Sequence, residues 1–529
     1  TNKFNIEYRL EFLEPYIGQP IIQENNGATK LLTPNEARMR NSTYSVAVYA
    51  DIGQSVRYRK DNGEWDEPDK ELVPRVMLGK IPIMLGSKFC VLSQKSTDTR
   101  MELGECKYDQ LGYFIINGNE KVLVSQEKMK ENNPNVHHYR GSKYSDCCEI
   151  RSVIDGRYNM TKTTTVKMMA KDNVGTGRTI RINIQGIKHD IPLFLIFRAL
   201  GVSSDKEIIK MITYNLEDNA MISLIKPSFE EGTAAYSQEE ALEEISKNIN
   251  LTVLSSNITP EEKQVAKTKY LKDVLVNYLL PHVGNSYEKK AYYLGYMTNR
   301  LLSCILGRRP YDDRDHFANK KVETAGVLLS YLFALNFRQK LIKQFRKEIL
   351  KDMSNLREGI KNIKLDKYIK PTIIDTGLKY SFATGTWNLK NSPSSTKVGV
   401  SQVLTRHNYK SALSHTRRVN TPMDKSQKKL VGPHNLHSTQ WGTICPSETP
   451  DGEQIGISKN LAIMSQITNF INPDPVIEIL LELGMKYIDE VGVNNISNGT
   501  KIFVNGNWIG MHYEPNVLVD ILKKYRRNG

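Results

Sequence analysis

Three carboxylates lie close together in a segment rich in proline and glycine. Glu448, Asp451 and Glu453 fall within residues 436–461, which read LHSTQWGTICPSETPDGEQIGISKNL. Clustered carboxylates can bind Mg²⁺. However, prolines and glycines specify the backbone path of a loop, which predicts a rigid loop that presents the three side chains separately. We therefore expect this carboxylate loop (436–461) to be functional and to hold no metal.

Two rings stand at the start of the carboxylate loop, at His437 and Trp441. Aromatic and imidazole rings can stack on nucleobases. Rings next to a rigid loop can equally pack against it, and packing of both rings is the interpretation that we favour.

A strongly basic segment lies just before this loop. Residues 390–430 hold nine basic residues against a single acid, Asp424, so their local net charge is +8 in a chain of net charge +15. Guanidinium and hydroxyl groups are common ligands of a phosphate backbone. A solvated loop would have a similar composition, but interspersed apolar residues such as Val400 and Val419 indicate that part of this basic segment folds against a core. This favours a positioned surface for a polyanion. The nine bases are Lys390, Lys397, Arg406, Lys410, Arg417, Arg418, Lys425, Lys428 and Lys429.

A third cluster places acidic residues around one arginine. Asp312, Asp313 and Asp315 surround Arg314 ahead of an expected long helix at 321–353. Such a cluster could do metal or acid–base chemistry. We favour an acidic cap at a helix N-terminus with internal ion pairs.

Known catalytic motifs are missing from the sequence. It contains no Walker-type phosphate loop, no Ser-His-Asp elbow, no His-Glu-x-x-His pattern and no dinucleotide fingerprint. Its six cysteines include no Cys-x-x-Cys pair, which argues against a zinc site or a disulfide framework. The sequence therefore predicts no self-sufficient catalytic centre.

Composition indicates a globular protein of several domains. The chain has 529 residues, 39% hydrophobic and 25% charged. No apolar run approaches the roughly 18 residues that a bilayer span requires, and no signal peptide is visible. We expect an intracellular protein without membrane contact, and leave nuclear or cytoplasmic location open. The positive net charge favours attraction to nucleic acid.

The elements that must position these residues follow an α+β, multidomain pattern. Strand-like runs dominate the first 145 residues, where Asn117-Gly118 separates two apolar runs and predicts a hairpin. Strands followed by helices come next. One helix is predicted to open with a Ser237–Glu240 capping box and another to end at Gly307. A helix at 477–485 and a second Asn-Gly hairpin at 500–510 are expected near the end.

Seven segments, taken together and in order, resemble one family. That family is the second-largest, β-like subunit of multisubunit DNA-directed RNA polymerases, in its eukaryotic, archaeal and large-DNA-virus form. The matching segments are 33–45, 79–93, 113–127, 308–326, 378–389, 399–422 and 436–462.

The resemblance implies a domain order. It assigns residues 1–145 to the first part of a protrusion domain with an N-terminal element, and 146–315 to a lobe. The second part of the protrusion would be 316–377, the fork 378–461 and the start of an external domain 462–529. In this family the fork lies near the RNA–DNA hybrid and downstream DNA.

The resemblance also implies which residues approach nucleic acid. Arg417 and Arg418 are the foremost candidates, and Gln402 joins them because it has a counterpart in the family. Glu448, Asp451 and Glu453 would form a loop near the active centre, although the family often has glutamate where this chain has Asp451. The full set expected to bind nucleic acid is Lys390, Lys397, Gln402, Arg406, Arg417, Arg418, Lys425, Lys428 and Lys429.

The resemblance implies partners and a division of labour. The family's lysines beside the active centre lie beyond the external domain, and its Mg²⁺ is held by the largest subunit. We therefore expect this chain to bind no cofactor and to be inactive alone. Its expected partners are the largest subunit, the remaining half of the second-largest subunit, template DNA and the RNA–DNA hybrid. It would be an engineered fragment or one half of a split subunit.

Two other functions stay open on composition. One is a stand-alone nucleic-acid-binding module, which predicts tight binding by the chain alone. The other is a structural assembly piece whose basic segment faces solvent, which predicts no salt-sensitive binding.

Overall fold

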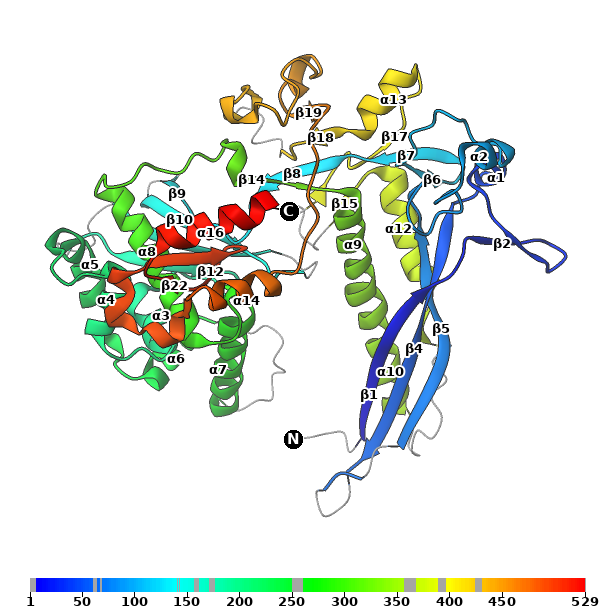
Figure 1. The fold of residues 1–529 in the computed structure, drawn as a ribbon. Coiled ribbons are helices and arrows are strands. Elements are labelled where there is room, and N and C mark those ends of the chain that lie inside the picture. The colour runs from blue at the N-terminus through cyan, green and yellow to red at the C-terminus, as the bar shows by residue number, and fades with distance from the viewer. Residues whose placement is uncertain are drawn as a thin grey trace. The chain divides into compact units, whose positions relative to one another are not determined.

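The computed structural model describes most of the chain. The described residues are 6–59, 64–66, 69–139, 141, 143–156, 161–170, 177–249, 260–355, 368–388, 396–423 and 431–528. Both helices and strands are well represented, which confirms the predicted α+β class (Figure 1). Among the described residues, no helix is long and apolar enough to cross a membrane.

The chain folds into two compact units, each built from two separate stretches of sequence. The first unit comprises Thr1–Lys128 and Val322–Ser465, and the second comprises Met129–Lys321 and Gln466–Gly529. The named domains of the polymerase family stay a prediction.

A long antiparallel sheet and a set of helices form the first unit's main core. The strands run in the order β1-β4-β5, and Val48, Ile52 and Leu78 are buried against the helices. Leu328, Leu332, Ile374 and Phe382 fill the helix side, and the fully buried Trp387 donates its indole N–H to the carbonyl of Leu328 at 3.0 Å. These elements are β1 (Ile6–Ile17), β4 (Ser45–Tyr58), β5 (Asp69–Pro82), α9 (Ala325–Leu335), a π-helical turn (Asn336–Leu341), α10 (Ile342–Asn355) and α12 (Thr372–Thr384).

Short elements make up the rest of the first unit. Asn117 and Gly118 both have positive φ, at 50° and 79°, which confirms the predicted hairpin between β6 and β7. The short strands are β2 (Ile21–Gln23), β3 (Thr29–Leu31), β6 (Phe114–Ile116), β7 (Asn119–Leu123), β8 (Ser125–Met129), β15 (Trp387–Asn388), β16 (Thr396–Lys397), β17 (Ser401–Val403), β18 (Arg418–Asn420) and β19 (Ser458–Asn460). The short helices are α1 (Pro34–Met39), α2 (Thr97–Glu102) and α13 (Tyr409–Thr416).

The second unit packs helices around a five-stranded antiparallel sheet. The strand order is β13-β12-β11-β10-β9. The predicted capping box at Ser237 and Glu240 is present, and Gly307, with φ of 71°, follows α8 as predicted. The elements are β9 (Asn135–His138), β10 (Tyr144–Ser152), β11 (Lys162–Met169), β12 (Ile180–Ile184), β13 (Ile191–Pro192), α3 (Leu193–Ala199), α4 (Asp205–Thr213), α5 (Asn219–Glu231), α6 (Gln238–Lys247), α7 (Pro260–Asn277) and α8 (Tyr287–Ile305).

The C-terminal stretch adds a small sheet and flanking helices to the second unit. The predicted hairpin at 500–510 is confirmed, because Asn505 and Gly506 take positive φ between β21 and β22. The predicted helix at 477–485 is present as α14 (Asp474–Glu482). The remaining elements are β20 (Lys486–Tyr487), α15 (Ile488–Val491), β21 (Thr500–Val504), β22 (Asn507–His512) and α16 (Pro515–Asn528).

Two local predictions are wrong. The helix expected from residue 321 begins at Ala325, because Lys320–Glu323 forms strand β14 beside β8. The acidic cluster therefore caps no helix. Asp312 instead accepts a hydrogen bond from the amide of Val136 at 2.8 Å and pairs with Arg300 at 3.1 Å. The ion pairs of this cluster join it to residues outside it, Asp312 to Arg300 and Arg309, and Arg314 to Glu149, so ion pairing within the cluster stays a prediction.

Candidate nucleic-acid interface

A four-stranded sheet fixes the backbone of the basic segment. Its order is β14-β8-β18-β19, with β18 parallel to β8 and antiparallel to β19. Val419, at the centre of β18, is fully buried and explains why this short strand docks here. The register pairs Arg418 with Asn460 and Val419 with Lys459. The sheet thereby joins the basic segment to the end of the carboxylate loop.

A buried ion pair links the two strands that flank β18. The Lys459 Nζ lies 2.6 Å from the Glu127 Oε2, and their side chains are only 8% and 2% exposed. Lys459 also donates to the Thr421 hydroxyl at 3.2 Å. The Lys459 charge is therefore neutralised by Glu127 inside the protein and does not add to the surface potential.

Lys397, one of the predicted nucleic-acid ligands, belongs to a second buried cluster. Its Nζ lies 2.5 Å from the Glu323 Oε2, while the other carboxylate oxygen accepts from Lys128 at 2.6 Å. Burial by itself would raise the pKa of Glu323, but the two ammonium groups outweigh burial, and the pKa lies below its usual value. The Lys397 ammonium group is thus held by a protein carboxylate.

Arg406 is likewise engaged by carboxylates. It contacts Glu120 at 2.5 Å and Asp109 at 3.3 Å, and its guanidinium lies 5.1 Å from the centre of the Tyr113 ring. The hydrogen bond to Glu120 contributes most to raising the pKa of Arg406. The Arg406 side chain is still 43% exposed, so it borders solvent, but its charge is largely balanced.

Gln402 and His415 bind each other below this surface. Helix α13 opens with a capping box formed by Asn408 and Ser411, and it carries His415 inward to 2% exposure. The His415 Nδ1 accepts from the Thr405 amide at 3.2 Å, so its Nε2–H donates to the Gln402 Oε1 at 3.0 Å. Burial, aided by the positive charge of Arg418, lowers the pKa of His415 to about 4. The imidazole is therefore neutral at pH 7.

Arg417 and Arg418 stand where α13 passes into β18. Arg417 donates from Nη2 to the carbonyls of Ala462 at 2.7 Å and Ile463 at 3.3 Å. An arginine has five N–H donors, and within the described part of the chain the others make no further bond. The half-buried Arg418 guanidinium has no hydrogen-bond or ion-pair partner among the described residues. This junction thus offers positive charge on a fixed backbone.

The carboxylate loop ends in β19, and its rigidity stays a prediction. It contains two short 3₁₀ turns, Ser438–Gln440 and Gly452–Gln454. The exposed Glu448 accepts from the Ser414 hydroxyl and so ties the loop to α13. Asp451 and Glu453 are exposed. Across the described ranges, no group of three or more His, Cys, Asp or Glu residues could hold a metal ion.

The favoured packing of Trp441 is wrong. Its side chain is 93% exposed, whereas His437 is half-buried and its Nδ1 lies 2.6 Å from the Thr439 hydroxyl. The exposed indole of Trp441 is accessible for stacking on a base or on a protein partner. Four predicted ligands, Lys390, Lys425, Lys428 and Lys429, lie outside the described residues.

Sequence reasoning missed the acids that neutralise this region. Glu120, Glu127 and Glu323 lie in the family-like segments 113–127 and 308–326, far from the basic segment in sequence, and nothing in those segments pairs them with its bases. Their strands are brought to it by sheet pairing, and no local signal could have identified them.

A family model for the RNA polymerase beta subunit matches residues 1–376, and a model for domain 3 of RNA polymerase Rpb2 matches residues 402–467. The chain belongs to the RNA polymerase β-subunit family. The predicted resemblance is thus confirmed, and it favours the polymerase reading over a stand-alone binding module or an assembly piece.

Named relatives cover nearly the whole chain. It is 42% identical over 98% of its length to DNA-directed RNA polymerase II subunit 2 of Arabidopsis thaliana, where it spans 43% of that protein. It is 40% identical to the RPB2 subunit of Encephalitozoon cuniculi, again over 98% of the chain and 44% of the relative. An archaeal relative, subunit Rpo2N of Methanococcus vannielii, is 33% identical, and the match covers 90% of this chain and 89% of that protein. The chain therefore spans less than half of its eukaryotic relatives and nearly all of an archaeal one.

Proposed function

We propose that this chain forms one side of the DNA cleft of a DNA-directed RNA polymerase and positions the RNA–DNA hybrid and downstream DNA during template-directed RNA synthesis. Family membership supports this proposal, because the relatives are named as subunits of such polymerases. The protrusion, lobe, fork and partial external domain are the parts that the chain would supply.

The observation that carries the proposal is the junction at Arg417 and Arg418. Phosphate contacts need positive charge that is held in place and not already neutralised. Arg418 meets both conditions, because β18 is fixed on both edges and its guanidinium has no hydrogen-bond or ion-pair partner in the described part of the chain. Lys397 and Arg406 fail the second condition, since Glu323 and Glu120 hold them.

The chemistry itself would lie elsewhere in the assembled enzyme. We propose that Mg²⁺ is held by the largest subunit, and that this chain binds no cofactor and makes no phosphodiester bonds alone. Its partners would be the largest subunit, the remaining half of the second-largest subunit, template DNA and the hybrid. Glu448, Asp451 and Glu453 would form a loop near the active centre without coordinating metal.

The test is elongation by an assembled polymerase that carries Arg417→Ala and Arg418→Ala together. We expect slower elongation on a pre-formed RNA–DNA scaffold, and a salt dependence of scaffold binding that falls by about 1–2 in log–log slope for two lost phosphate contacts. The matched control is Arg526→Ala with Arg527→Ala, a second tandem arginine pair, which is exposed at the end of α16.

Equal elongation and equal salt slopes for the two double variants would contradict the proposal. RNA extension by the isolated chain with Mg²⁺ and nucleotides would separately contradict its non-catalytic role.

A further inference from the structure

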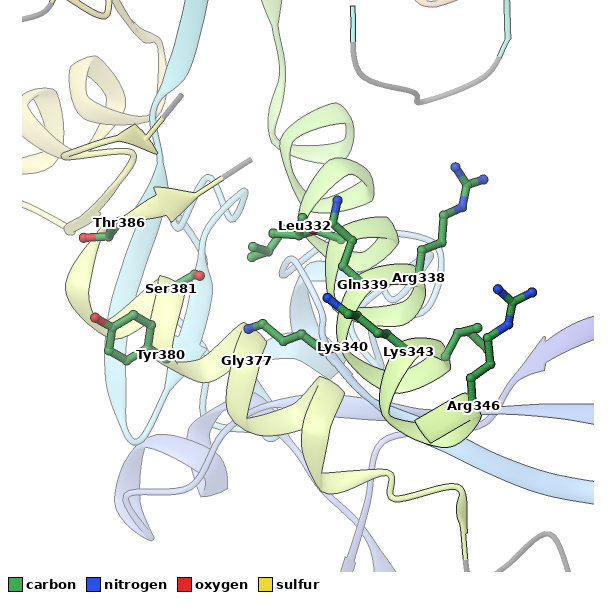
Figure 2. A pocket seen from close by; sticks show the side chains of 12 residues that line it. Leu332, Arg338, Gln339, Lys340, Lys343, Arg346, Gly377, Tyr380, Ser381 and Thr386 are labelled. Atoms are coloured by element: carbon green, nitrogen blue, oxygen red, sulfur yellow. The ribbon is translucent and has the colours of Figure 1, made fainter. Parts of the chain in front are cut away.

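A basic groove lies in the first unit, away from the basic segment in sequence. It has a volume of about 530 Å³ and runs between the α9–α10 helix and α12 (Figure 2). Its lining contains no acidic side chain and four cationic ones, Arg338, Lys340, Lys343 and Arg346. Like charges three residues apart on a helix repel each other, so this arrangement favours an anion that would balance them.

Three of the four charges in this groove are not neutralised within the described part of the protein, unlike those of Lys397 and Arg406 in the basic segment. Lys340, Lys343 and Arg346 are exposed, and within the described ranges none of the three makes a hydrogen bond or ion pair. The acids on the neighbouring turns are already engaged: Asp375 pairs with Lys379 at 3.2 Å, and Glu348 with Lys370 at 2.9 Å.

A π-helical turn shapes the groove. Residues Asn336–Leu341 form this turn between α9 and α10, and such turns are frequent at functional sites. Figure 2 shows the ammonium ends of Lys340 and Lys343 extending toward α12, while Arg338 and Arg346 extend from the other flank of the helix. The basic side chains therefore line both margins of one helix surface.

The contact between the two helices next to the groove is closely packed and polar. Asn336 is fully buried and donates from Nδ2 to the Leu332 carbonyl at 2.9 Å, whereas its Oδ1 has no hydrogen-bond partner. Gly377 on α12 lines the groove, and a Cβ added there would clash with the Asn336 amide. The missing side chain at Gly377 lets the two helices approach closely beside the groove.

We propose that this groove binds the phosphate backbone of a single nucleic-acid strand. Single-strand sites combine a basic track with aromatic rings on which bases stack. Tyr380, which is 64% exposed and lines the groove, supplies such a ring, and Ser381 and Thr386 also line the groove. From Lys340 to Arg346 the track of unpaired cations is about 9 Å long at 1.5 Å per residue, room for about two phosphates. The choice of nucleic acid among anions rests on the function proposed above.

The first test is protection of lysines from acetylation in the 529-residue chain, read by mass spectrometry. A single-stranded 12-nucleotide DNA should slow modification of Lys340 and Lys343. Lys347, exposed one turn further along the same helix but outside the groove, should react at an unchanged rate. Equal rates at all three lysines with and without DNA would overturn the proposal.

The second test compares two charge reversals on one helix. Lys343→Glu should lower the salt slope of DNA binding by about 0.7, the value of one single-strand phosphate contact, and Lys347→Glu should lower it less. Equal slopes for the two variants would overturn the assignment. Equal protection of Lys340 and Lys343 by a polyglutamate peptide would overturn the choice of nucleic acid.

Failure of this site is distinguishable from failure of the proposed function. The polymerase proposal is tested by Arg417→Ala with Arg418→Ala in elongation, and the groove is tested by protection at Lys340 and Lys343. Normal elongation by the Arg417→Ala, Arg418→Ala variant, together with full protection of Lys340 and Lys343, would reject only the role proposed for Arg417 and Arg418.

Discussion

Replacing Glu323 with glutamine should destabilise the first unit more than the loss of an exposed ion pair in that unit would. The Glu323 side chain is 4% exposed, and its two oxygens are held by Lys128 and Lys397, whose side chains are 14% and 16% exposed. Glutamine keeps the shape but leaves two nearly buried ammonium groups facing each other without the anion. Breaking a buried ion pair in this way costs about 3–5 kcal/mol. We expect the lower part of that range, because both lysines keep some contact with water.

The measurement is urea-induced unfolding of the chain, followed by circular dichroism. Asp375→Asn is the matched control, since it makes the same carboxylate-to-amide change in the same unit at an i,i+4 pair whose side chains are 25% and 36% exposed. That loss should cost less than about 1 kcal/mol. A Glu323→Leu variant that also carries Lys128→Met and Lys397→Met should recover most of the stability, because apolar replacement of a buried ion cluster is often neutral or stabilising.

The same pair of proteins makes a pH prediction. The pKa of Glu323 is lowered in the folded state from its usual 4.5, so the folded protein holds the proton less tightly than the unfolded chain. Its contribution to stability is therefore present in full above about pH 4.5 and is lost as pH falls through the lower folded pKa. The stability gap between wild type and Glu323→Gln should be constant from pH 7 to 5 and narrow below. Two results would contradict the buried cluster of Glu323 with Lys128 and Lys397 as the source of this stability. One is a loss of unfolding free energy in Glu323→Gln no larger than that in Asp375→Asn, and the other is a stability gap that widens as pH falls.

Two further substitutions, at His415 and Gly456, test the contacts that hold the backbone of the candidate interface. The pKa of His415 is lowered to about 4, so near pH 6.5 the unfolded chain binds a proton that the folded protein does not bind. The free energy of unfolding should therefore fall as pH drops from 6.5 to 4, and His415→Gln should make that fall smaller. An NMR titration of His415 with a midpoint near pH 6.5 would contradict this assignment. Gly456→Ala should destabilise the carboxylate loop by well over the roughly 1–2 kcal/mol of a left-handed alanine, because Gly456 has φ of 71° and an added Cβ would clash with the His434 backbone. Gly452→Ala, with φ of 76° and open space around the Cβ, is its control, and equal melting temperatures for the two variants would show that the loop can relax.

Local signals in the sequence predicted local structure well. Asn117-Gly118 and Asn505-Gly506 specify tight hairpins because both residues tolerate positive φ, and both turns are present. The Ser237–Glu240 capping box is equally self-contained, since its hydrogen bonds join residues three apart. In each case the determining interaction lies within a few residues, so the sequence pattern is sufficient.

Features set by distant partners could not be predicted. Residues 321–323 have a composition compatible with a helix start but form a strand because β8 offers an edge. Glu323 meets Lys128 and Lys397 across separations of 195 and 74 residues, and no pattern marks those pairs. The exposure of Trp441 likewise depends on what surrounds it in space, which composition does not record.

Formal charge and available charge are different quantities in this protein. The basic segment has a local charge of +8, yet Lys397 and Arg406 are matched by carboxylates supplied from distant strands. A polyanion that approaches the described part of this segment meets mainly the charges of Lys410, Arg417 and Arg418, because none of the three has an ion-pair partner among the described residues. In the groove the lining has no acid, and Lys340, Lys343 and Arg346 make no hydrogen bond or ion pair among the described residues, so most of the formal charge there is available. Substituting a matched base should therefore change unfolding free energy and leave the salt slope of binding intact, whereas substituting an available base should do the reverse. Measuring both quantities for each base separates the residues that hold the fold from those that hold a ligand.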